Sequence, residues 1–241
     1  MTVESSLINR PVAPPQYKQL LIVIVLRFLI VPFVHGGLWD VVASFLFLHI
    51  TFLIIQSYQL KRAKFILFVA IATIGFLLDV MLTLDWIASA IAPTLVVQIV
   101  YAFFFGSAAI LILRRILQAS RVTMDIVRGG VCVYLLLGYF WALLYSIVYT
   151  LDANSFSSEL VTEDSYLKVL YFSFVTLTTL GFGDVVPVTE IASVLTVLEA
   201  LVGQIYPTIF IALLVSGYLA HQPLPEDKEI SGNDITRQNR F

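Results

Sequence analysis

Cysteine, histidine and charge are all scarce in this chain, and each shortage excludes a class of function. The single Cys132 lies in an apolar run, so no disulfide within the chain is possible. The three histidines are His35, His49 and His221; they are far apart, and none has a partner at metal-ligand spacing. No nucleotide-binding loop and no nucleophile motif is present either. We therefore predict no enzyme activity, no cofactor, no small-molecule substrate and no nucleic-acid partner.

Apolar sequence is what the chain has in excess: 59% of its 241 residues are hydrophobic, 12% are charged, and the mean hydropathy is +0.94. A soluble core could not hold so many apolar side chains, so we predict an all-α membrane protein in contact with lipid. A spanning helix needs about 20 residues. Six stretches are long enough, or nearly so: about 20–34, 41–58, 65–86, 93–113, 127–150 and 190–219. The first could instead be a secretory signal, but a polar, Pro-rich segment precedes it and no cleavage pattern follows.

The apolar stretch 166–178 is too short to cross a bilayer, and it predicts a re-entrant helix buried in protein, with Thr162 and Asp164 as capping residues. Charge placement predicts the orientation. Basic residues gather on one side of the predicted spans, namely Arg10, Lys18, Lys61, Arg62, Lys64, Arg114, Arg115, Arg121, Arg128, Lys228, Arg237 and Arg240. By the positive-inside rule both termini are then cytoplasmic, and the re-entrant segment enters from outside.

Residues Thr178–Asp184 follow the re-entrant stretch and read Thr-Thr-Leu-Gly-Phe-Gly-Asp. They resemble the selectivity filter of the potassium channel superfamily, and the likeness continues over residues 171–187. Such filters replace the hydration shell of K+ with backbone carbonyl oxygens, and glycines with positive φ allow alternate carbonyls to turn to one side. The resemblance implies K+ as the permeant ion, bound in this chain by Thr179, Leu180, Gly181, Phe182 and Gly183.

One filter per chain implies that four chains build the pore, so we expect a homotetramer. The resemblance divides the chain into a cytoplasmic segment 1–19, a four-helix sensor-like block 20–118, a pore domain 119–219 and a short cytoplasmic tail 220–241. The block has the layout of a voltage sensor without its charges. Residues 93–113 contain no basic side chain, and Arg114 and Arg115 come only at the end of that span. We predict weak or absent voltage dependence.

The resemblance also implies residues that support the filter. In many family members Trp residues of the pore helix hold the hydroxyl of a filter Tyr. Here Tyr171 and Phe172 occupy those positions and Phe182 replaces the Tyr, so we expect apolar packing to brace the filter. Glu199 in the last span is expected to brace it from behind, either charged or protonated. Its candidate partners are the hydroxyls of Ser173, Thr176 and Tyr145.

Four more positions follow from the resemblance. Asp184 stands at the outer mouth, where it either concentrates cations or holds a turn by hydrogen bonds to nearby backbone. Gly203 matches the position where inner helices of the family bend, and with Pro207 it forms a candidate gating hinge; close helix packing is the other explanation of the glycine. The face expected to line the inner cavity includes Gln204 and Ile211.

These features favour a potassium-selective channel that conducts passively in a prokaryotic inner membrane. A poorly selective cation channel is the first alternative, and a non-conducting membrane sensor or transporter subunit is the second. Two charges lie well away from the ends of the predicted spans in the sensor-like block. Arg27 and Asp79 either form an ion pair there or reach toward the membrane surfaces.

Overall fold

A computed structural model of the protein describes residues 17–30, 38–57, 62–84, 86–87, 90–119, 122–157 and 166–219. Within these ranges the chain is all-helical, as predicted, with an isolated β-bridge and no strand. The helices are α1 (Tyr17–Ile30), α2 (Leu38–Ser57), α3 (Arg62–Thr83), α4 (Ile91–Leu117), α5 (Met124–Leu151), α6 (Tyr166–Leu177) and α7 (Glu190–Leu219). The expected caps Thr162 and Asp164, most of segment 1–19 and the tail 220–241 lie outside the described residues.

Four helices are long and apolar enough to cross a membrane, judged by length and composition within the described residues. They comprise Phe65–Thr83 of α3, Ile91–Leu117 of α4, Met124–Leu151 of α5 and Glu190–Gly217 of α7. The first two predicted spans remain predictions: α1 has 14 residues, and α2 has 20 residues whose side chains are only partly described. The stretch expected to be re-entrant forms the 12-residue α6, too short to span.

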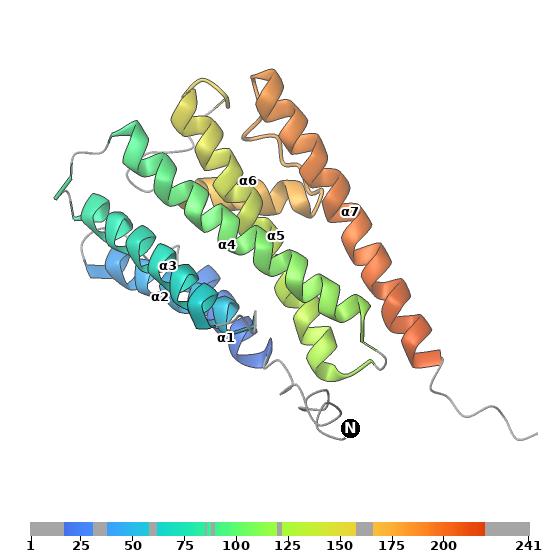
Figure 1. The fold of residues 1–241 in the computed structure, drawn as a ribbon. Coiled ribbons are helices and arrows are strands. Elements are labelled where there is room, and N and C mark those ends of the chain that lie inside the picture. The colour runs from blue at the N-terminus through green and yellow to red at the C-terminus, as the bar shows by residue number, and fades with distance from the viewer. Residues whose placement is uncertain are drawn as a thin grey trace, which may run out of the picture.

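The pair α4 and α5 forms the centre of the molecule. Thr123 caps α5, its side-chain oxygen accepting a hydrogen bond from the backbone N–H of Ile126 at 3.4 Å. Only residues 118–123 separate the two helices, so they return side by side. Helix α5 also contacts α1, α6 and α7, and α6 lies across it next to α7 (Figure 1).

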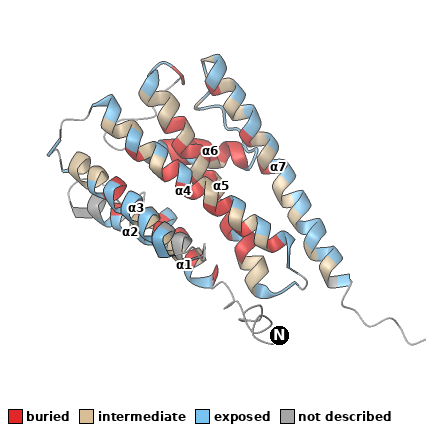
Figure 2. Ribbon diagram, viewed as in Figure 1, coloured by how far each residue is buried: buried red, intermediate tan, exposed pale blue. Residues whose placement is uncertain are grey.

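Burial is concentrated on α5, where the side chains of Leu136, Tyr139 and Tyr145 are 0% exposed. Figure 2 shows the contrast with α7, most of which is exposed or half-buried. Its exposed side chains are nevertheless apolar and include Val194, Val197, Leu201, Ile205 and Ile209. Within a single chain, therefore, the last helix leaves a long apolar face uncovered.

The two charged side chains deep within helices of the sensor-like block, Asp79 and Arg27, both have partners inside it. Asp79 on α3 accepts hydrogen bonds from the Ser44 hydroxyl at 2.7 Å and from the Tyr101 hydroxyl at 3.2 Å. The guanidinium carbon of Arg27 lies 4.5 Å from the centroid of the Phe47 ring. Neither side chain has to reach a membrane surface to find polar or aromatic partners.

Candidate functional site

Helix α6 is seated between α5 and α7 by two glycines. A Cβ at Gly138 of α5 would overlap the ring of Phe174, and a Cβ at Gly203 of α7 would overlap the backbone carbonyl of Leu177. Both glycines therefore allow a neighbouring helix to approach α6 closely. The structure supports the packing explanation of Gly203, because the clash would be with fixed backbone. The position of a gating hinge stays a prediction.

The segment that follows α6 turns its N–H groups back onto that helix. Thr179 donates to the Thr176 carbonyl at 2.8 Å, and Leu180 and Gly181 donate to the Val175 carbonyl at 2.9 and 3.3 Å. In a trans peptide the C=O of one residue points opposite to the N–H of the next. The carbonyl oxygens of residues 178–180 consequently point away from α6.

The backbone of the same segment alternates in conformation. Thr179, Gly181 and Gly183 have φ of 57°, 59° and 78°, whereas Leu180 and Phe182 do not have positive φ. Thr179 is the only non-glycine residue with positive φ among the described residues. Positive φ is ordinary for glycine and strained for a β-branched residue. Such strain is typical of functional backbone that its surroundings hold in place.

The outer part of this segment is held by Tyr171 of α6. The ring of Tyr171 stacks on Phe182, with ring centroids 6.3 Å apart and an interplanar angle of 6°. The Tyr171 hydroxyl donates to Oδ2 of Asp184 at 2.8 Å. This bond raises the pKa of Tyr171, because the carboxylate favours the protonated hydroxyl. The expected apolar packing around Phe182 is present, and the sequence analysis missed the polar bond beside it.

The loops on either side of α6 are joined to each other by backbone contacts. Phe156 and Pro187 form an isolated antiparallel bridge, and the N–H of Val188 donates to the carbonyl of Ser155 at 2.8 Å. The ring of Phe156 also lies edge-to-face against Phe172 of α6, with centroids 5.3 Å apart. Phe172 is thus buried against this bridge, whereas Phe182 is exposed.

Glu199 is the one fully buried carboxylate among the described residues, and it joins three helices. Its Oε2 accepts a hydrogen bond from the Tyr145 hydroxyl of α5 at 2.5 Å. Its Oε1 accepts one from the Ser173 hydroxyl of α6 at 2.6 Å. Two of the three expected partners are therefore in contact with it. For Thr176, the third, the described hydrogen bonds include none between its hydroxyl and Glu199.

The inner end of the segment is in contact with α7. Nε2 of Gln204 donates to the hydroxyl of Thr179 at 2.7 Å. Pro207 lies inside α7 without ending it, and Ile211 is exposed one turn farther along. The sequence analysis placed Gln204 on the cavity face but gave no sign of its bond to Thr179, because the sequence does not fix the position of the loop relative to α7.

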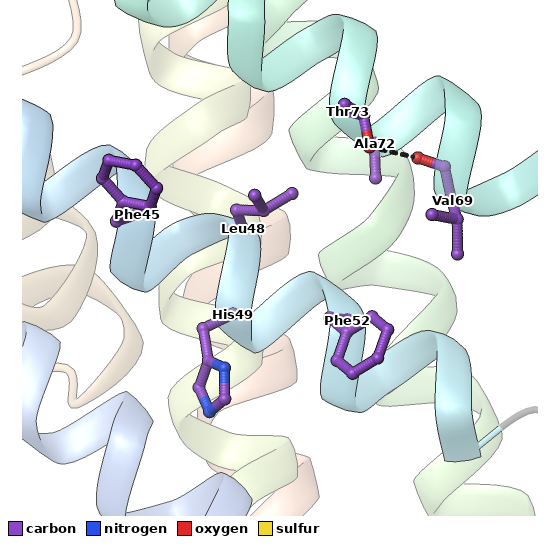
Figure 3. Close-up of a pocket in the computed structure, with 7 residues that line it drawn as sticks. All are labelled: Phe45, Leu48, His49, Phe52, Val69, Ala72 and Thr73. Atoms are coloured by element: carbon purple, nitrogen blue, oxygen red, sulfur yellow. Dashed lines mark hydrogen bonds between the residues drawn. The ribbon is translucent and has the colours of Figure 1, made fainter.

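A separate cavity of about 270 Å³ lies between α2 and α3 (Figure 3). It is lined by Phe45, Leu48, His49, Phe52, Val69, Ala72 and Thr73. The Thr73 hydroxyl donates to the Val69 carbonyl of its own helix at 2.8 Å, and the His49 ring lies on the side of α2 away from Thr73. No group of three or more possible metal ligands occurs among the described residues. This cavity is an apolar gap between two helices, distant from the 178–184 segment.

Long apolar helices, a short helix seated between two of them and a loop with carbonyls turned outward define a membrane channel pore module. Residues 130–218, which make up less than half of the chain, match the family model described as "Ion channel". The match confirms the resemblance to the potassium channel superfamily found in residues 178–184. It covers α5, α6, the filter-like segment and α7 and leaves out α1–α4. No curated protein and no solved structure matches the chain significantly.

Proposed function

We propose that this ion channel is selective for K+ and conducts it passively through a filter formed by Thr179–Gly183. The proposal is carried by the alternation of positive φ at residues 179, 181 and 183. A chain that alternates in this way can present successive carbonyl oxygens to one axis, as dehydration of a cation requires. The N–H groups turned back onto α6 support the same direction for the carbonyls of residues 178–180.

The channel is a homotetramer in this proposal. Each chain supplies a single filter segment, and a ring of carbonyls around one ion needs several. The uncovered apolar face of α7, with Val197, Leu201 and Ile205, is where neighbouring chains pack around the axis. Asp184 of each chain then stands at the outer mouth, where four carboxylates raise the local cation concentration.

We further propose six spans, with α6 re-entrant from the outside and both termini in the cytoplasm of a prokaryotic cell. The 12 residues of α6 are compatible with a re-entrant helix. Helices α1 and α2 are apolar and pack with α3 and α5. No catalysed reaction is part of this function.

Bi-ionic reversal potentials of the purified protein in planar bilayers test the proposal. With K+ on one side and Na+ on the other, a selective filter shifts the reversal potential. The shift is about 59 mV for each tenfold increase in the permeability ratio, because each ion carries one elementary charge. A potential near zero together with measurable current would support the poorly selective cation channel instead. The absence of any cation current would support a non-conducting protein.

A glycine substitution connects that measurement to residue 181. Gly181→Ala places a Cβ at φ 59°, at a cost of about 1–2 kcal/mol in each chain, and should lower K+ selectivity by at least tenfold. Gly75→Ala is the matched control, because its Cβ would meet only side-chain atoms in the sensor-like block. Equal selectivity of the two variants would contradict the assignment of the filter.

A further inference from the structure

We propose that Gln204 is a positioning residue for the innermost cation site: its side-chain amide fixes the Thr179 hydroxyl so that one oxygen lone pair faces the ion. This inference rests on the proposed channel function. In it, Gln204 not only lines the cavity but also takes part in ion binding.

The hydrogen bonds of Thr179 define how its hydroxyl is used. Its Oγ1 donates its proton to the carbonyl of Thr178 at 2.7 Å and accepts a hydrogen bond from Nε2 of Gln204 at 2.7 Å. A hydroxyl has one proton and two lone pairs. The proton and one lone pair are therefore occupied, and the second lone pair is left for a cation.

Without Gln204 this arrangement is not fixed. Hydroxyl groups rotate to suit their partners, and the side chain of Thr179 is exposed. A second partner on a different element, 25 residues away in the chain, removes that freedom. Helix α7 is continuous through residues 190–219, so the amide is presented from a rigid support.

The orientation of the amide also has a consequence for the cavity. Because Nε2 faces Thr179, the geminal Oε1 of Gln204 points away from that hydroxyl and is free to face the inner cavity of the proposed pore. In a fourfold assembly these carbonyl oxygens form a polar ring just below the filter, on a face that continues to the exposed, apolar Ile211 and Val215. A cation that leaves the filter then finds uncharged oxygen ligands there, as alkali and alkaline-earth cations prefer.

Block by internal Ba2+ tests the proposal, because this divalent cation is close to K+ in size and has to bind inside the pore to stop current. Gln204→Met has a side chain of similar length and no hydrogen-bond donor. We expect it to weaken Ba2+ block by about tenfold, because the loss of one hydrogen bond costs about as much free energy as a tenfold change in affinity. The carboxylate of Gln204→Glu can only accept a hydrogen bond, so it draws the Thr179 proton away from the Thr178 carbonyl. Ba2+ block of this variant should therefore also change, by more than the added charge alone explains when ionic strength is matched. Thr208→Val is the control, since that hydroxyl bonds to the Gln204 carbonyl of its own helix at 2.8 Å.

A double-mutant cycle with Thr179→Val separates positioning from a merely structural effect. If Gln204 acts through the Thr179 hydroxyl, Gln204→Met should have less than a twofold effect once that hydroxyl is gone. Full additivity, or unchanged Ba2+ block in the Gln204→Met single variant, would overturn the proposal while the parent protein still conducts K+. A parent protein without K+ current would overturn the channel function itself, and this inference with it. Should Gln204→Met fail to assemble, Gln204→Glu and Gln204→Lys provide the same comparison without and with a donor.

Discussion

Replacement of Glu199 should destabilise the pore module in a way that depends on the hydrogen bonds of the new side chain. Glu199 is 0% exposed and receives the hydroxyls of Tyr145 and Ser173. The Ser173 oxygen also lies 2.8 Å from the carbonyl of Gly138, to which it can donate. In Glu199→Ala the Ser173 proton can go to Gly138, and only the Tyr145 hydroxyl loses its described partner.

The magnitude follows from these contacts. One buried hydroxyl without a partner costs about 1–3 kcal/mol. A void of roughly 50 Å³ adds about 1 kcal/mol at ~24 cal/mol per Å³. We therefore expect Glu199→Ala to lose about 2–4 kcal/mol in each chain. Glu199→Gln should lose less than about 1 kcal/mol, because its carbonyl can accept from Tyr145 while its NH2 group donates to Ser173.

Thermal unfolding of the purified protein in detergent, followed by size-exclusion chromatography, measures the order of these stabilities. Tyr145→Phe should fall between the Gln and Ala variants, since it leaves one carboxylate oxygen without its donor. Ser193→Ala is the control, because that hydroxyl bonds to the carbonyl of Thr189, the residue just before its own helix. Equal stability of the Ala and Gln variants would refute the reasoning, as would full additivity of Glu199→Ala with Tyr145→Phe.

Three further predictions concern the filter and the block. Gly203→Ala should destabilise the assembly by about 1–3 kcal/mol, because its Cβ meets the Leu177 backbone; an unchanged melting temperature with altered open probability would support a hinge instead. Tyr171→Phe keeps the ring stack and loses the bond to Asp184, so K+ current should be less sustained than in the parent during long recordings at low external K+, and equal time courses would count against this brace. The conductance–voltage relation should be shallow, since residues 93–113 carry no basic side chain. A slope as steep as the movement of three or more gating charges per chain produces, at about 2.3 kcal/mol per charge per 100 mV, would contradict this prediction.

Much of the pore module could be predicted from the sequence because its elements have local signals. The long apolar runs predicted the bounds of α4, α5 and α7 to within a few residues, and the short run before Thr178 predicted α6. Gly181 and Gly183 stand where the backbone takes positive φ, which is the property that distinguishes glycine from other residues. Thr179 shares that conformation without any such signal, since its φ is imposed by the surrounding bonds.

Contacts between distant segments were harder to predict. A buried carboxylate needs partners, and this rule predicted three candidates for Glu199, of which Tyr145 and Ser173 are in contact with it and Thr176 is not. The bonds from Tyr171 to Asp184 and from Gln204 to Thr179 depend on where the loop lies relative to α6 and α7. Because polar side chains at exposed positions are compatible with many partners, nothing in their spacing selects these two.

The sensor-like block bears directly on the helix that carries the filter. Phe28 of α1 lies edge-to-face against Phe174 of α6, with ring centroids 5.1 Å apart, and Tyr139 of α5 contacts the same ring at 6.3 Å. The carbonyl of Phe174 accepts both the N–H and the hydroxyl of Thr178, at 3.0 and 2.6 Å. Any shift of α1 must therefore repack a side chain whose own backbone holds the first residue of the filter-like segment. Helix α1 therefore packs directly on the helix that precedes the filter-like segment, and this contact is the physical route by which the block could act on that segment.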